Sequence, residues 1–371
     1  MWKKSSFSDK IANYLCLGIV VFFTILSLFR LYPFSETTPG ISNEIDDWFR
    51  YWDNGNDIVK NGILIPSQKG EYYGPGSFLY NYFIATCILV FGKNDSTIYL
   101  IHSILLSSSI VIIYQSFKHK LSSFSGIALL LTLSVFGYLD VLKNYSFKLL
   151  SENLALFLVA LFVYFVSVFF QHKRILHLYL AGIFLVLNIL TRLTLLPFAF
   201  VFLALIFIYF IKTKSITLKK MIPLLLLVLF GISIIAFRNY LVCGKWTFLP
   251  TEGMSDAYSQ SGEFTLINVA KKTLYSFGYL KILNQDYQIR PHWFLLWFAY
   301  FFYLYQKIKN YKNIPFDELI FNVFIIVIYA LNLVFVTVTS YGFRAYLPAI
   351  FLLIALSFIE LDKLRIFHKL R

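Results

Sequence analysis

Charged residues are scarce in this chain: they make up 14% of its 371 residues, whereas hydrophobic residues make up 58%. A soluble domain has about 25% charged and about 45–50% apolar residues, so this composition excludes a water-soluble globule. It also excludes a disordered chain, because disordered segments are poor in apolar residues. The three cysteines are scattered, with no CxxC pair and no cysteine–histidine cluster, and they predict neither a disulfide framework nor a zinc site.

Long apolar runs are what the chain has in abundance, together with 41 Phe and 26 Tyr. A helix needs about 20 mainly apolar residues to cross a bilayer. The sequence therefore predicts an all-α, polytopic membrane helix bundle that forms one domain over 1–371, surrounded by membrane lipids. The ten expected spans are 11–31, 97–117, 122–140, 152–170, 175–190, 193–211, 221–237, 291–306, 318–337 and 344–360.

A further apolar run, 77–92, is short, and its crossing would invert every later loop. Cytoplasmic loops carry an excess of Lys and Arg, so the charges can decide. If 77–92 does not cross, the inside segments hold 18 basic and five acidic residues, and the rest of the chain holds 15 and 14. We therefore expect 77–92 to lie in the outer interface or to dip in and return.

We expect a multi-pass protein of the plasma or inner membrane. In the resulting topology both termini lie in the cytoplasm. Two outer loops are long, 32–96 and 238–290, and loops of such length are usually functional. Spans two to seven occupy 97–237, the last three occupy 291–360, and 361–371 forms a cytoplasmic tail. The net charge of +14 does not indicate nucleic-acid binding, because the basic residues lie in clusters between apolar runs rather than on one soluble face.

The first outer loop contains a stretch whose apolar residues fall near helical spacing, which predicts a helix on the membrane surface. Asp46 and Asp47 lie at its start. Carboxylates are favoured at a helix N-terminus by the dipole alone, so this position by itself does not establish catalysis.

The same stretch resembles the first outer loop of the GT-C superfamily, the membrane glycosyltransferases that use polyprenyl-phosphate sugars, and in particular the aminoarabinose-transferase and protein O-mannosyltransferase group. Asp47-Trp-Phe-Arg-Tyr51 fits the acidic residue and tyrosine of that loop, and Gly62 lies at a similar distance beyond it. The family usually has Asp-Glu where this chain has Asp46-Asp47, so Asp46 is the second candidate for the acidic position.

Four further motifs are similar to the family's and come in the right order. The resembling segments are Tyr72-Tyr73-Gly74-Pro75-Gly76, Ser151-Glu152-Asn153, Arg238-Asn239-Tyr240 with Thr251-Glu252-Gly253, and Arg344-Ala-Tyr346-Leu-Pro348. Some relatives place a phosphate-binding lysine where this chain has Gly74, which leaves Lys69 as the candidate for that contact.

The resemblance implies sugar transfer from a polyprenyl-phosphate donor to a glycan, lipid or protein acceptor at the extracytoplasmic face. Asp47 would be the general base of an inverting reaction, and Glu152 would orient the acceptor or share a divalent metal with Asp47; the sequence leaves a metal open. The expected phosphate contacts are Arg238, Arg344, Arg192 and Lys69. The expected acceptor-side residues are Tyr73, Tyr346 and Glu252, and the loop 238–290 is expected to help form the acceptor site.

Simpler interpretations exist for each charged position. An arginine at a helix end commonly extends to lipid phosphates, and Glu152 is also typical of a helix start. Two other functions remain open at this point. One is a polysaccharide polymerase or O-antigen ligase, and the other is a transporter or flippase for a lipid-linked sugar, although the chain shows no internal repeat of the transporter kind.

Overall fold

The computed structural model describes most of the chain. The described residues are 7–31, 47–63, 78–146, 149–213, 218–244, 246, 265–267, 270, 273, 279–281, 287–289, 291–338 and 346–364. The main helices, in chain order, are α1 (Phe7–Leu31), α2 (Asp47–Asn61), α3 (Phe78–Phe91), α4 (Asp95–Phe117), α5 (Ser123–Phe136), the π-helix η3 (Gly137–Ser146), α6 (Glu152–His172), α7 (Ile175–Thr191), α8 (Leu196–Thr213), α9 (Ile222–Cys243), α12 (Pro291–Lys309), α13 (Phe316–Val338) and α14 (Leu347–Lys363).

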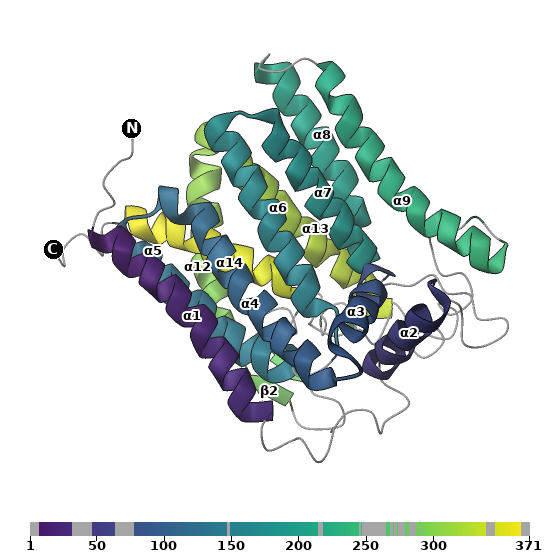
Figure 1. Cartoon of the computed structure of the whole chain (residues 1–371). Helices are drawn as coiled ribbons and strands as arrows, with labels where there is room; N and C mark the ends of the chain where they lie inside the picture. Colours follow the sequence, from purple (N-terminus) through teal and green to yellow (C-terminus); the bar gives the residue numbers. More distant parts are fainter. Residues whose placement is uncertain are drawn as a thin grey trace.

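The structure confirms an all-α membrane helix bundle (Figure 1). Each of the ten expected spans coincides with a helix, the third of them with α5 and η3 together. Among the described residues, six helical stretches are long and apolar enough to cross a membrane: those of α1, α4, α5 with η3, α6, α8 and α9. Large apolar side chains such as Phe230 and Phe237 of α9 are exposed, which suits a helix that faces lipid.

The path of the chain between α1 and α4 bears on the short run 77–92. Ser27, near the end of α1, donates a hydrogen bond to Ser103, near the start of α4, with 2.5 Å between the hydroxyl oxygens. At the other end of the pair, Cys16 lies beside Gln115. The two helices are therefore antiparallel, and the chain leaves α1 and enters α4 at the same end of the bundle. This is the arrangement that a non-crossing 77–92 requires, and α3, at 14 residues or about 21 Å, is too short to span the core.

The turns that the charge rule assigns to one side do meet at one end, which we call the basic end. It contains η2 (Lys118–Lys120), Lys173 and Arg174, η5 (Leu218–Met221), η6 (Tyr311–Asn313) and the end of α14. The contacts that join these turns are Gln171 with His119, Lys120 with Asp317, Tyr209 with Phe316, and Ser122 with Asp362.

Two glycines allow α7 and α9 to pack closely in the lipid-exposed part of the bundle. A Cβ atom at Gly182 would collide with Leu224, and one at Gly231 would collide with Val186. Small residues at such positions let membrane helices approach one another. The pairing also shows that α7 and α9 run parallel, so their C-terminal ends lie at the same end of the bundle, opposite the basic end.

Most of the expected outer loop 238–290 lies outside the described residues. Within it, β1 (Tyr279–Lys281) and β2 (Tyr287–Ile289) pair antiparallel, with Leu280 opposite Gln288. The sequence analysis did not predict this hairpin, because three residues are too few to show the alternation of a strand.

The topology predicts which positions an impermeant thiol reagent can reach from outside intact cells. In a background with Cys243 replaced by Ser, single cysteines at Lys219 and Lys312 should stay unlabelled, because both lie at the basic end. Cysteine at Lys93, which is exposed between α3 and α4, should be labelled. The native Cys16 and Cys87 are buried and serve as the unreactive background. Labelling at positions 219 and 312 but not at position 93 would show that the protein has the opposite orientation in the membrane.

Candidate active site

Helix α2 begins at Asp47, as expected. It packs on α3 at the end of the bundle opposite the basic end (Figure 1). Tyr51, one turn after Asp47, packs edge-on against Tyr80 of α3, with 4.9 Å between the ring centroids. Gly55 lies so close to α3 that a Cβ atom there would come within 2.6 Å of Ile84. These contacts fix the first turns of α2 over α3; the side chain of Asp47 itself is outside the description.

A buried hydrogen-bonded chain leads from α3 towards Glu152. The Tyr80 hydroxyl lies 3.0 Å from Nε2 of His102, and Nδ1 of His102 lies 3.3 Å from the carbonyl oxygen of Ser146. A carbonyl can only accept, so Nδ1 carries the proton and Nε2 accepts from Tyr80. Ser146 in turn donates to Asn153, at 3.0 Å, next to Glu152.

The electrostatic surroundings of Tyr80 include Tyr51 of α2 and the acidic residue Glu152. Burial raises the pKa of its phenol, and the neighbouring Tyr51 and Glu152 raise it further. Tyr80 is therefore close to the first turns of α2 on one side and to Glu152 on the other. The structure thus brings together two parts of the chain that the family motifs singled out separately.

Glu152 forms an ion pair with Arg192, another of the expected site residues. Glu152 begins α6 and Arg192 follows α7, and Arg192 Nη1 donates to Glu152 Oε1 at 3.0 Å. The Glu152 side chain is only 2% exposed and that of Arg192 16%. Asn188 supports the pair by donating to the carbonyl oxygen of Ala155 at 2.6 Å, which ties the end of α7 to the start of α6.

Arg238 lies in the last turns of α9, where it is 3% exposed and donates to Asn239 Oδ1 at 2.8 Å. Because α7 and α9 run parallel in the register given by Gly182 and Gly231, Arg238 lies at about the same height as Arg192. Two cationic side chains thus reach the end of the bundle at which α2 begins.

A third polar group at this end was missed by the sequence analysis. Asp140, in η3, is buried and lies 3.2 Å from Nε2 of His292 at the start of α12, and Trp293 Nε1 donates to the same oxygen at 3.3 Å. The sequence shows His292 near a span end but not its partner, 152 residues away. In the structure, Asp140 lies within the π-helix η3, and π-helical turns are frequent at functional sites.

The remaining expected site residues are placed as follows. Tyr346 precedes α14, is 1% exposed, and stacks on Tyr329 of α13 at 4.5 Å between ring centroids. The others lie outside the described residues: Asp46, Lys69, Tyr73, Glu252 and Arg344. In the part of the chain that the structure describes, no three or more His, Cys, Asp or Glu side chains are grouped to hold a metal ion.

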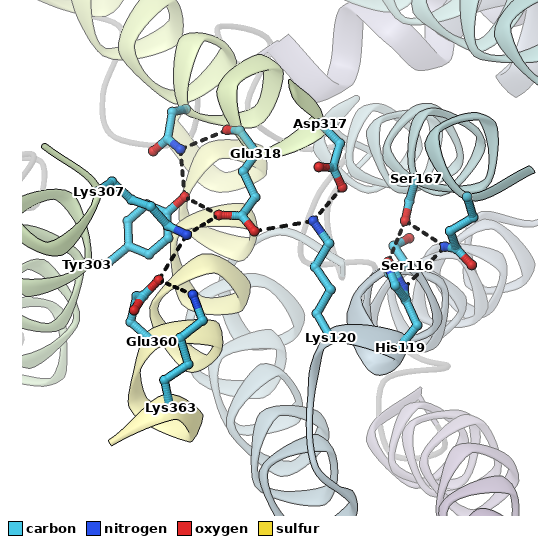
Figure 2. Close-up of polar contacts among 12 residues, drawn as sticks. Ser116, His119, Lys120, Ser167, Tyr303, Lys307, Asp317, Glu318, Glu360 and Lys363 are labelled. Atoms are coloured by element: carbon cyan, nitrogen blue, oxygen red, sulfur yellow. Dashed lines mark hydrogen bonds and ion pairs between the residues drawn. The ribbon is translucent and has the colours of Figure 1, made fainter. Parts of the chain in front are cut away.

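A second polar cluster lies at the basic end, far from these residues, and holds helices together (Figure 2). Lys307 Nζ contacts Glu318 at 2.6 Å and Glu360 at 2.9 Å, and Lys120 contacts Asp317 at 2.5 Å. These ion pairs join the turn after α4 to α12, α13 and α14. Their charges are matched one to one with Lys363 included, so the cluster satisfies itself and offers no surplus charge to a substrate.

Comparison with known proteins agrees with the motif-based resemblance. Residues 75–238 match the family model of dolichyl-phosphate-mannose-protein mannosyltransferase, a segment that contains Glu152, Arg192 and Arg238. The fold is similar to the oligosaccharyltransferase AglB of Archaeoglobus fulgidus, solved in complex with an inhibitory peptide and a dolichol-phosphate: the TM-score is 0.54 at 13% identity, over 96% of this chain and 52% of that chain. An apo oligosaccharyltransferase structure from the same organism gives a TM-score of 0.50 at 12% identity, with the same coverage of 96% and 52%.

At these identities the structural likeness shows a shared fold, and the chain spans about half the length of the solved relatives. No curated protein matches the chain. The matched segment and the shared fold together support the resemblance to the GT-C membrane glycosyltransferases. The family whose model matches the segment is the dolichyl-phosphate-mannose-protein mannosyltransferase family, which agrees with the protein O-mannosyltransferase resemblance of the motifs.

Proposed function

We propose that the protein transfers a sugar from a polyprenyl-phosphate donor to an acceptor hydroxyl or amine at the extracytoplasmic face of the membrane. The observation that carries the proposal is the convergence, at one end of the bundle, of the start of α2, the Glu152–Arg192 pair and Arg238. These residues come from four separate parts of the chain.

The chemistry of the proposed reaction needs two kinds of group. The leaving group is a phosphate monoester and already a weak base, so no general acid is required. The site must supply a base for the acceptor and positive charge for the departing phosphate. Asp47 suits the first need, and Arg192 and Arg238 suit the second, since a guanidinium can hold a phosphate through two parallel hydrogen bonds. One base and one displacement imply inversion at the anomeric carbon.

Glu152 has a more limited role in this proposal than a second base would have. Its buried carboxylate is engaged by Arg192, which orients the guanidinium at the end of α7. We propose that Glu152 acts mainly by holding Arg192 in place for the donor phosphate. Should a divalent metal be bound, Asp46, Asp47 and Glu152 are the oxygen ligands of the kind that such a cation prefers.

The nature of the donor and acceptor is supported by the comparisons. The matched family takes its name from a dolichyl-phosphate sugar and a protein acceptor, and the similar AglB structure was solved with a dolichol-phosphate and a peptide. By extension, we propose a polyprenyl-phosphate donor and a protein or glycan acceptor for this chain. The same comparisons favour a transferase over a polymerase, ligase or flippase.

Purified protein in lipid vesicles should transfer radiolabelled sugar from a polyprenyl-phosphate donor to an acceptor prepared from the host cell envelope. The corresponding nucleotide sugar should give no product, because it lacks the phosphate-linked lipid that the membrane site is built to receive. Transfer from the nucleotide sugar alone, or none from a panel of polyprenyl-phosphate donors, would contradict the proposed donor class.

A further inference from the structure

The basic end has two flanks of different character. On the flank of α6 to α9, five cationic side chains are exposed: Lys173, Arg174, Lys212, Lys219 and Lys220, which we call the lysine patch. The sequence contains no Asp or Glu between Glu152 and Glu252, so no acidic residue of this segment can neutralise the patch.

Hydrogen bonds gather the patch from two separate turns. The Tyr179 hydroxyl donates to the carbonyl oxygen of Lys220 at 2.9 Å, which fixes η5 against the first turns of α7, close to Arg174. Lys173 Nζ donates to the Tyr209 hydroxyl at 2.8 Å and lies 4.8 Å from the ring centroid of Phe170. Lys173 is thereby held at the end of α8, beside Lys212.

The opposite flank shows how the same protein treats lysines that have a structural role. There, Lys120, Lys307 and Lys363 each contact at least one carboxylate (Figure 2). The lysine patch has five cations against three on that flank, and its own segment contains no carboxylate between Glu152 and Glu252. A surplus of this kind indicates an anionic ligand from outside the chain.

Exposed apolar side chains lie directly beside the cations of the patch. Leu176 is 60% exposed, Ile211 53% and Ile222 55%, and each is within three residues of a patch cation. These side chains lie at the ends of expected membrane spans, so the cations stand at the height of the lipid headgroups of the adjoining leaflet. An anionic phospholipid satisfies both features, because its phosphate meets the cations while its acyl chains cover the apolar residues.

We propose that the lysine patch binds the headgroups of anionic phospholipids in the adjoining leaflet and so selects an anionic lipid shell for this flank of the enzyme. Neighbouring cations on one surface add their attraction for such headgroups, by about 1 kcal/mol per Lys or Arg near the membrane surface. The proposal does not depend on the transfer reaction, since the patch lies at the end of the bundle opposite the candidate active site.

Lipid binding can be measured on the full chain in detergent micelles, by titrating fluorescently labelled phosphatidylglycerol and, separately, labelled phosphatidylcholine. The variant K219Q/K220Q should bind phosphatidylglycerol about 30-fold more weakly than the native protein, at about 1 kcal/mol for each charge removed. The matched control is K309Q/K312Q, which removes two exposed lysines at the same end but outside the patch. It should bind with nearly native affinity.

Three results would overturn the proposal. If K309Q/K312Q weakens phosphatidylglycerol binding as much as K219Q/K220Q does, only the net charge of the protein matters. If phosphatidylcholine binds with the same affinity as phosphatidylglycerol, binding does not depend on the charge of the headgroup. Displacement of the labelled lipid by millimolar inorganic phosphate would identify a site for soluble anions instead. Unchanged unfolding temperatures of both variants establish that neither measurement reports misfolding.

Discussion

Asp47→Asn should lower the rate of sugar transfer by about 100- to 10,000-fold, the usual cost of losing a general base. The substitution keeps the size of the side chain and removes its charge and its ability to accept a proton. Asp47 is the first residue of α2, and Tyr51, one turn later, packs on Tyr80 of α3, so the helix should keep its place when Asp47 is replaced by Asn. Single-turnover transfer of radiolabelled sugar measures the effect.

The matched control for this substitution is Asp53→Asn on the same helix. Asp53 is an exposed carboxylate six residues after Asp47 on α2. Partial desolvation and the nearby Asp57 raise its pKa above the usual value. It should transfer sugar at nearly the native rate. Asp46→Asn tests the register: loss of activity there, with Asp47→Asn active, would move the base by one residue and keep the mechanism.

Donor binding should respond differently. Asp47 acts on the acceptor, so its substitution should leave donor affinity largely intact, whereas Arg238→Ala should weaken it by about 1.5–3 kcal/mol per charged hydrogen bond. If Asp46→Asn, Asp47→Asn and the double variant all transfer sugar normally, the first-loop carboxylates have a structural role and the proposed reaction has no base.

The sequence predicted the helices of this fold well because the signal for a membrane span is local. A run of about 20 apolar residues identifies a span without knowledge of its neighbours. The path of the chain around 77–92 was predictable for a different reason: loop charges add up over the whole chain, and a single extra crossing would have moved every basic cluster after the first. The antiparallel packing of α1 and α4 agrees with that result.

The partners of the site residues were not predictable, because they depend on packing between distant segments. Glu152 and Arg192 were both singled out, but their ion pair joins the start of one helix to the end of the next, 40 residues away. Asp140 was overlooked because a lone aspartate after an apolar run gives no signal until His292 is beside it. The hydrogen-bonded chain through Tyr80 and His102 could not be predicted for the same reason, since a lone His102 in an apolar helix indicates only a buried histidine.

The Glu152–Arg192 pair leads to the second large expected effect, this time on stability. Arg192→Gln should lower the free energy of unfolding by about 3–5 kcal/mol, the usual cost of removing one partner of a buried ion pair. The reason is that the Glu152 side chain, 2% exposed, would remain without its guanidinium partner. Thermal or denaturant unfolding of the protein in a fixed detergent measures the change.

The double variant E152Q/R192Q distinguishes a structural pair from a phosphate clamp. The double variant removes both charges of the pair at once. Its loss of unfolding free energy relative to the native protein should therefore be much smaller than the loss caused by Arg192→Gln alone. Donor affinity should not recover with it, because the guanidinium that would hold the phosphate is still missing. Recovery of both stability and donor affinity in the double variant would show that Arg192 serves the fold alone, and the phosphate would then have to be held by Arg238 and the other cationic positions.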